Sequence, residues 1–146
     1  MLDSFDRKPT FSFWVIGAVA LLWNLLGLML YVMQVSTDPE LLAAAYTAEQ
    51  FALIDATPAW ATAMTAIATN AGVLASVLLL LRRRASVILF AVSLAAIVVQ
   101  DIYIFGMTSS VEVFGVQVLV IQSVVLLAAV LLLWYARRTA ATGMLR

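Results

Sequence analysis

Four long apolar runs dominate the sequence and limit what the chain can fold into. They extend over about 11–35, 58–81, 85–107 and 113–136. Each can cross a bilayer, whose hydrocarbon core needs about 20 helical residues. Backbone groups in lipid must bond to one another, so spanning segments form helices or closed barrels, and these runs lack the strict alternation of barrel strands. The sequence therefore predicts an all-α polytopic membrane protein, a single domain over 1–146 built as an antiparallel four-helix bundle.

Composition agrees with a lipid environment and excludes several kinds of chemistry. Hydrophobic residues make up 65% of the chain and charged residues 11%, whereas soluble domains typically carry about 45–50% and about 25%. Cysteine and histidine are absent, which excludes disulfides, thiolate nucleophiles, the usual zinc sites and histidine-ligated haem. Serine–histidine and cysteine–histidine catalysis is excluded with them. We expect neither a cofactor nor a metal.

The charged residues divide between the two ends of the predicted bundle. The basic residues are Arg7, Lys8, Arg82, Arg83, Arg84, Arg137, Arg138 and Arg146, all at a terminus or in the second connection. The other two connections contain only acids, namely Asp38, Glu40, Glu49, Asp55 and Glu112. The positive-inside rule then predicts that both termini are cytoplasmic. The arginines favour anionic membrane lipids and are typical of any polytopic protein, so we expect no nucleic-acid partner.

The first outer connection has the features of a short helix. Asp38, Pro39 and Glu40 together form a typical helix start, with a capping side chain, proline in the first turn and an acid near the positive end of the dipole. Apolar residues at roughly helical spacing follow. We expect a short interfacial helix over about 38–54, lying on the outer membrane surface.

Polar residues within the apolar runs are the candidates for a functional site. The candidate ligand-binding residues are Trp23, Asn24, Tyr31, Gln34, Asn70, Gln100, Asp101, Tyr103 and Gln122. Residues three or four apart share a helix face, and three such faces carry polar or small side chains: Asn24, Gly27, Tyr31 and Gln34; Thr62, Thr65, Thr69, Gly72 and Ser76; Ser93, Ala96, Gln100 and Tyr103. By depth, Asn24, Asn70 and Gln122 lie near the middle of the bilayer. If these faces converge, they form an uncharged polar pocket in the outer half of the bundle.

Two interpretations of these polar residues remain open. Amide and hydroxyl groups often hydrogen-bond between transmembrane helices, which is typically worth about 0.6–2 kcal/mol per contact. Amides and hydroxyls among aromatic walls also suit a site for a small neutral or amphipathic molecule. The first interpretation predicts that the amides pair with one another in a dry bundle, whereas the second predicts that they line a cavity.

Asp101 is the one acid within the predicted spans. It is either hydrated near the outer surface, held by groups such as Gln100, Gln117 or Tyr103, or protonated, as a proton-coupled transporter would require. Paired-carboxylate hydrolysis would need Asp101 close to Glu112. No nucleophile, phosphate loop or metal cluster accompanies these two acids, so we expect no enzymatic activity.

Several motifs along the chain together resemble a known family. They are Trp23-Asn24-Leu25 with Gly27, Tyr31 and Gln34, then Pro58-Ala59-Trp60-Ala61-Thr62, the leucine-rich run into Arg82 and Arg83, Glu112-Val113-Phe114-Gly115, and Gly143-Met144-Leu145. This pattern resembles a group of small bacterial four-helix inner-membrane proteins loosely labelled "sugar transporter". The resemblance covers almost the whole chain and implies a four-helix fold in a bacterial inner membrane. It also implies an apolar residue after Gln100, where this chain has Asp101.

The leading functional hypothesis is a binding or transport-type component that recognises a small neutral solute through the outer pocket. Four helices are few for alternating access, so transport would need a homo-oligomer. The alternative is an accessory or scaffolding subunit whose helix faces pack against a partner membrane protein. Membrane lipids surround the chain in either case.

Overall fold

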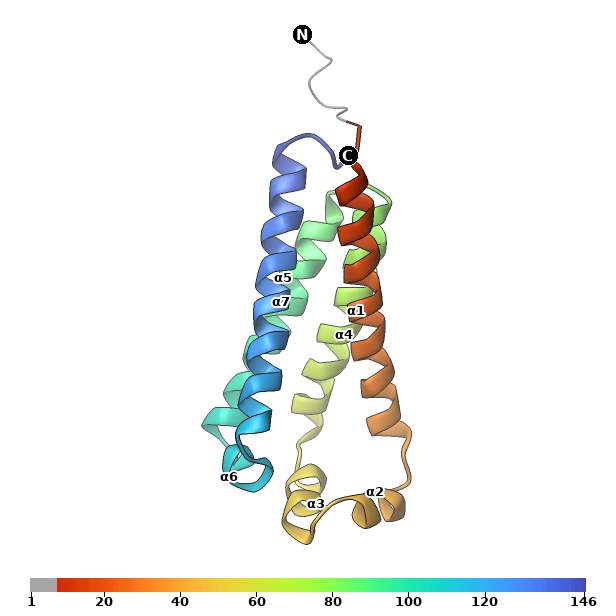
Figure 1. Ribbon diagram of the computed structural model, residues 1–146. Helices are drawn as coiled ribbons and strands as arrows, with labels where there is room; N and C mark the ends of the chain where they lie inside the picture. Colours follow the sequence, from red (N-terminus) through yellow and green to blue (C-terminus); the bar gives the residue numbers. More distant parts are fainter. Residues whose placement is uncertain (1–7) are drawn as a thin grey trace.

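The computed structural model describes residues 8–146, which form seven helices joined by short turns (Figure 1). The helices are α1 (Phe11–Ser36), α2 (Pro39–Ala45), α3 (Ala48–Asp55), α4 (Ala59–Leu80), α5 (Ala85–Gly106), α6 (Ser110–Phe114) and α7 (Val116–Ala141). α1, α4, α5 and α7 are 22 or 26 residues long and apolar enough to cross a membrane. The predicted all-α four-helix membrane bundle is confirmed, and the chain is a multi-pass membrane protein. Arg7 lies outside the described residues.

The long helices form a row in chain order. α1 packs against α4, α4 against α5, and α5 against α7. Consecutive long helices are antiparallel, and the C-terminus lies at the same end of the bundle as the start of α1 (Figure 1). The turn between α4 and α5 is tight, and Arg82 adopts a left-handed φ of 59° within it. α1 and α7 are therefore the first and last members of the row.

Small side chains on α4 allow its neighbours to approach closely. Its buried residues are Ala61, Ala68, Ala71, Gly72, Ala75, Ser76 and Leu79. A methyl group added to Gly72 would overlap the side-chain oxygen of Asn24, and one added to Gly17 would press on the side chain of Leu80. Lipid tails are as apolar as leucine, so transmembrane helices associate through such close packing rather than through a hydrophobic driving force.

The C-terminal segment closes the end of the bundle that carries the basic residues, which we call the arginine end. After α7 the chain turns at Gly143, whose φ is 77°. The N–H of Arg146 then donates to the carbonyl of Arg82 at 2.6 Å, and the N–H of Arg84 donates to the carbonyl of Arg146 at 2.9 Å. These bonds hold Leu145, which is 1% exposed, in a core cluster with Phe13, Ala75, Leu79, Phe90 and Ala136. The last residues thus link α7 to the turn between α4 and α5.

The opposite end carries Asp38, Glu40, Glu49, Asp55 and Glu112, and we call it the acidic end. Asp38 caps α2 as expected, because its carboxylate accepts the N–H of Glu40 at 2.9 Å. The single helix expected over 38–54 is instead two helices, α2 and α3. Thr47 starts α3 with a capping box, in which its hydroxyl accepts the N–H of Gln50 and its own N–H donates to the side chain of Gln50. This reciprocal cap begins a new helix within the segment.

The fourth span also differs from its predicted bounds of 113–136. Gly115 has a φ of 78°, a conformation that favours glycine, and it separates the short α6 from α7. α7 then continues past Arg137 and Arg138 to Ala141, because basic side chains are favourable near the negative end of a helix dipole. The acidic end is consequently covered by three short helices, α2, α3 and α6.

Candidate ligand-binding cleft

One face of α1 lines the larger of two cavities in the bundle. Asn24, Gly27, Tyr31 and Gln34 all contribute to this cleft, as their helical spacing predicted, and Trp23 joins them from the middle of α1. The cleft has a volume of about 440 Å³, which is within the range of about 300–1,000 Å³ found for small-molecule sites. Four of the nine candidate residues, Trp23, Asn24, Tyr31 and Gln34, are thus on or beside a single face of α1.

The opposite wall of the cleft is α7, and its floor is α4 and α5. The lining side chains are Ile121, Gln122, Val125, Ala129 and Leu132 on α7, Thr65, Ala68 and Thr69 on α4, and Phe90, Ser93, Ile97 and Gln100 on α5. Large apolar residues on both walls are exposed, Leu30 by 55% and Ile121 by 60%. The cleft therefore opens sideways between α1 and α7, on the surface that faces lipid.

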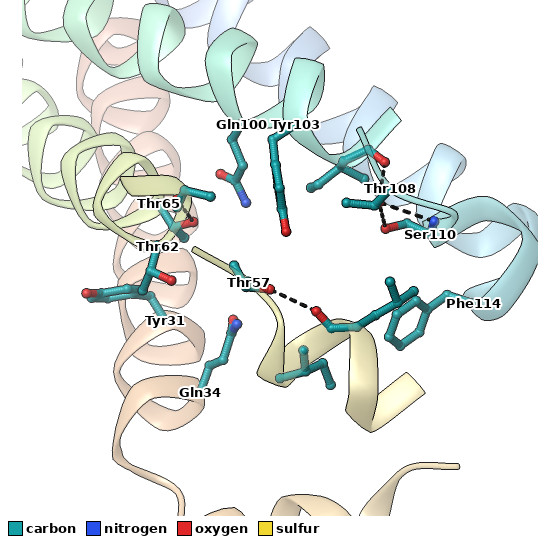
Figure 2. A pocket seen from close by; sticks show the side chains of 14 residues that line it. Tyr31, Gln34, Thr57, Thr62, Thr65, Gln100, Tyr103, Thr108, Ser110 and Phe114 are labelled. Atoms are coloured by element: carbon teal, nitrogen blue, oxygen red, sulfur yellow. Dashed lines mark hydrogen bonds between the residues drawn. The ribbon is translucent and has the colours of Figure 1, made fainter. Parts of the chain in front are cut away.

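A second, smaller cavity of about 130 Å³ lies at the acidic end (Figure 2). We call it the vestibule. Tyr31 and Gln34 enter it from α1, Thr62 and Thr65 from α4, and Gln100 and Tyr103 from α5, as Figure 2 shows. α3, α6 and the residues beside them complete it with Leu53, Ile54, Thr57, Thr108, Ser110 and Phe114. An edge-to-face contact between Tyr46 and Phe114 at 6.4 Å connects the end of α2 to α6.

Four residues line both cavities, and we call them the collar: Tyr31, Gln34, Thr65 and Gln100. They come from α1, α4 and α5, so three of the four long helices meet at this level. The vestibule lies on the acidic side of the collar, and the cleft extends from it toward the middle of the bundle. The collar is thus the polar junction between an opening at the acidic end and an opening toward lipid.

Most polar groups at the collar and in the vestibule are free to bind a ligand. Within the part of the chain that the structure describes, the side chains of Tyr31, Gln34, Thr62, Gln100 and Tyr103 make no hydrogen bond to another residue. The ring of Tyr103 is positioned by an edge-to-face contact with Trp60 at 5.3 Å. None of the described side chains that line either cavity is charged. The arrangement can donate to and accept from hydroxyl or carbonyl groups.

Asn24, in contrast, has a structural role. Its amide nitrogen donates to the carbonyl of Ala20 at 2.8 Å and to the hydroxyl of Ser76 on α4 at 3.1 Å. Ser76 donates in turn to the carbonyl of Gly72 at 2.8 Å. The absence of a side chain at Gly72 leaves the space that the Asn24 amide occupies. Asn24 therefore borders the cleft while its amide joins α1 to α4.

Asp101 and Gln122 form a pair between α5 and α7. The amide nitrogen of Gln122 donates to a carboxylate oxygen of Asp101 at 2.9 Å. Gln122 lines the cleft, whereas Asp101 lines neither cavity. The partners expected for Asp101 were Gln100, Gln117 or Tyr103, and its partner is instead the amide that faces it across the helix interface. Asp101 is half-buried. Its link to the cleft is the hydrogen bond that holds the side chain of Gln122 in place.

Asn70 lines neither cavity, so its predicted place in the pocket is wrong. It is exposed on the outer face of α4, and its amide nitrogen donates to the carbonyl of Ala66 in its own helix at 2.8 Å. Asn70 follows Thr69 by one residue, which rotates it by about 100° around the helix. It therefore points away from the cleft that Thr69 lines.

The vestibule includes residues that the sequence patterns did not identify. Thr108, Ser110 and Phe114 belong to the segment around α6. The hydroxyl of Thr108 donates to the carbonyl of Ile104 and lies at 2.5 Å from the hydroxyl of Ser110. The only signal for this segment was the glycine at 115 with hydroxyl residues before it, which marks a break in a helix.

The fold and the site together define a class: a four-helix integral membrane protein with an uncharged cleft between its first and last spans. Comparison with known proteins adds no relative to this description, since no family model, no curated protein and no solved structure matches the chain.

Proposed function

We propose that the protein is a binding or transport-type membrane component that holds a small neutral or amphipathic molecule at the collar. One observation carries the proposal: five polar side chains around an uncharged cavity have no partner among the described residues. If these groups served only to join helices, they would be paired, as Asn24 and Gln122 are. Unpaired amides and hydroxyls at a cavity are the usual means by which a site orients an uncharged ligand.

The protein acts without catalytic machinery in this proposal. None of the described acids lines either cavity: Asp101 is bonded to Gln122, and Asp55 and Glu112, which flank the vestibule, are exposed. The described residues include no group of His, Cys, Asp or Glu that could hold a metal ion. The family resemblance supports a bacterial inner membrane as the location. The charge distribution supports cytoplasmic termini and a vestibule that opens on the outer side.

Removing the collar amide of α5 tests this proposal. We expect Gln100→Leu to lower ligand occupancy about ten-fold, because a ligand hydroxyl would lose a partner and meet an apolar group. Occupancy is measured by native mass spectrometry of the protein extracted in mild detergent, from the co-purifying mass. Gln117→Leu is the matched control, because Gln117 is exposed and lines neither cavity. Equal loss in both variants, or no bound molecule in the unmodified protein, would contradict the proposal.

A second candidate function, as a subunit of an assembly, is favoured by Asn70. The residue lies at the middle of α4 and is exposed, yet its side-chain oxygen has no bond to a described residue. An unpaired polar group in hydrocarbon costs several kcal/mol. In a two-fold symmetric dimer, Asn70 would meet the same residue at the same depth, and each amide could donate to the other. This arrangement would provide the homo-oligomer that four-helix transport requires.

The assembly is tested by Asn70→Leu, which keeps the size of the side chain and removes its polar atoms. We expect dimers to dissociate about ten-fold more readily, since hydrogen bonds between transmembrane helices are worth about 1–2 kcal/mol. The measurement is the monomer–dimer ratio from single-molecule photobleaching at known protein-to-lipid ratios. Leu74→Ala on the same exposed face provides a comparison for packing alone. A monomeric unmodified protein would contradict the second candidate and leave the ligand site intact.

A further inference from the structure

The length of the cleft matches the thickness of one membrane leaflet. Its lining residues extend along α1 from Trp23 to Gln34 and along α7 from Ile121 to Leu132. Each stretch covers about 16 Å at 1.5 Å per residue. Half of the hydrocarbon core of a bilayer is about 15 Å. The cleft therefore begins at the collar and is long enough for one hydrocarbon chain. It continues toward the arginine end as far as Phe90 and Leu132, beside the core cluster that contains Leu145.

The polarity of the cleft changes along this length as the polarity of a lipid does. At the acidic end it begins with the unpaired groups of Tyr31, Gln34 and Gln100. Farther in, its lining is mostly apolar and includes Ile97, Val125 and Leu132. The amide of Asn24 also lies at this depth, but it is bonded to Ala20 and Ser76. A molecule in the cleft thus meets free hydrogen-bonding groups at one end. Along the rest it meets mostly hydrocarbon, together with the side chains of Thr69, Ser93 and Gln122, which already donate hydrogen bonds within the protein.

The charge around the polar end limits the head group that it can accept. Five acids lie at the acidic end, and Asp101 adjoins the cleft through Gln122. The sequence contains no lysine or arginine over 9–81 or 85–136, so no cation of this chain can balance a phosphate there. An anionic head group would be repelled by the surrounding carboxylates. Amides and hydroxyls suit a head group that carries hydroxyls and no net charge.

We infer that the occupant of the cleft is a membrane lipid with an uncharged, hydroxyl-bearing head group, drawn from the leaflet at the acidic end. The head group binds at the collar, and one hydrocarbon chain lies along the cleft between α1 and α7. The lipid enters sideways, because the cleft opens toward lipid past Leu30 and Ile121. This inference rests on the proposed function and specifies its ligand.

The test uses the full chain in phosphatidylcholine nanodiscs, because sugar-headed detergents share the chemistry of the inferred ligand. Trp23 lines the cleft and serves as the only tryptophan once Trp14, Trp60 and Trp134 are changed to phenylalanine. Two probes carry the same single dibrominated stearoyl chain, which quenches tryptophan on contact. One is the monoacylglycerol, with an uncharged diol head group, and the other is the lysophosphatidylglycerol, with an anionic phosphate. Free glycerol is the soluble competitor.

We expect saturable quenching by the monoacylglycerol at a mole fraction at least about ten-fold lower than for the lysophosphatidylglycerol, a difference of about 1.4 kcal/mol. Gly27→Phe fills the cleft from α1, where an added Cβ atom has only Thr69 within 4 Å, at 3.8 Å. Ala129→Phe fills it from α7. Each should weaken the saturable quenching about ten-fold or more. Gly106→Phe, on the exposed end of α5, should leave it unchanged. Circular dichroism checks that each variant folds, and the two walls give independent tests.

The remaining outcomes separate the two proposals. Equal or tighter binding of the anionic probe would overturn the head-group assignment. If quenching is indifferent to both phenylalanine variants while Gln100→Leu still removes a co-purifying soluble solute, the lipid inference fails and the proposed function stands. If neither probe binds saturably, glycerol does not bind and nothing co-purifies, both fail.

Discussion

Gly72→Leu is expected to lower the midpoint of thermal unfolding by about 10 °C, the largest stability change of any single substitution considered. The leucine side chain would occupy the position of the Asn24 amide, so α1 must move away from α4 or Asn24 must leave Ser76. Overpacking typically costs about 1–3 kcal/mol, and loss of the Asn24–Ser76 bond adds about 1 kcal/mol. For a chain of this size, about 3 kcal/mol corresponds to a shift of roughly 10 °C. The measurement is circular dichroism of the purified protein during heating.

Two further variants separate overpacking from the lost hydrogen bond. Gly106→Leu makes the same chemical change where the nearest side-chain atom is 4.0 Å from the added carbon, and its midpoint should stay within about 2 °C. Ser76→Ala removes the acceptor for Asn24, together with the hydroxyl's bond to the Gly72 carbonyl, without overpacking the helix interface, and should give a small part of the Gly72→Leu effect. A Gly72→Leu protein as stable as the original would show that α1 and α4 are not in contact at this level.

The number and order of the spans follow from the sequence because they depend on hydropathy alone. Segments of about 20 apolar residues have no stable alternative to a helix in lipid. All four spans were therefore predicted, and the bounds of α1, α4 and α5 were predicted to within one residue. The start of α7 was placed three residues too early, since an apolar run does not reveal the left-handed φ of Gly115. The C-terminal segment was not anticipated, because Leu145 is buried by bonds between residues more than 60 positions apart.

The candidate site was predicted in part because helical spacing shows which residues share a face but not what that face meets. The spacing of Asn24, Tyr31 and Gln34 correctly placed them together. Depth alone placed Asn70 with them, and the packing of α4 turned it outward. Spacing also could not distinguish Asn24, which is bonded to α4, from Gln100, which is free. That distinction depends on the distance between helices, and it is the one that bears on function.

A single cysteine is expected to show which end of the bundle faces the cytoplasm. The natural chain has no cysteine, so Glu49→Cys and Arg83→Cys each carry one thiol, at the acidic end and the arginine end respectively. Both positions are exposed. In intact bacterial cells a membrane-impermeant maleimide should label Glu49→Cys almost completely and Arg83→Cys almost not at all. The reason is the positive-inside bias, together with the cost of placing an arginine within the membrane, about 2.5–3.5 kcal/mol at a helix centre.

Lysed cells are the control, since both thiols should then react to the same extent. The reverse pattern in intact cells would place the vestibule on the cytoplasmic side and contradict the proposed orientation. Labelling of both positions in intact cells would mean that the chain inserts in two orientations. With the expected pattern, the collar lies in the outer leaflet, and the cleft runs from it toward the arginine end. The collar then meets the head groups of that leaflet, while the arginine end, closed by Leu145, blocks the same path from the cytoplasm. A molecule held at the collar would therefore have access from the outer side and from the surrounding lipid in this conformation, and release into the cytoplasm would require α1 or α7 to move.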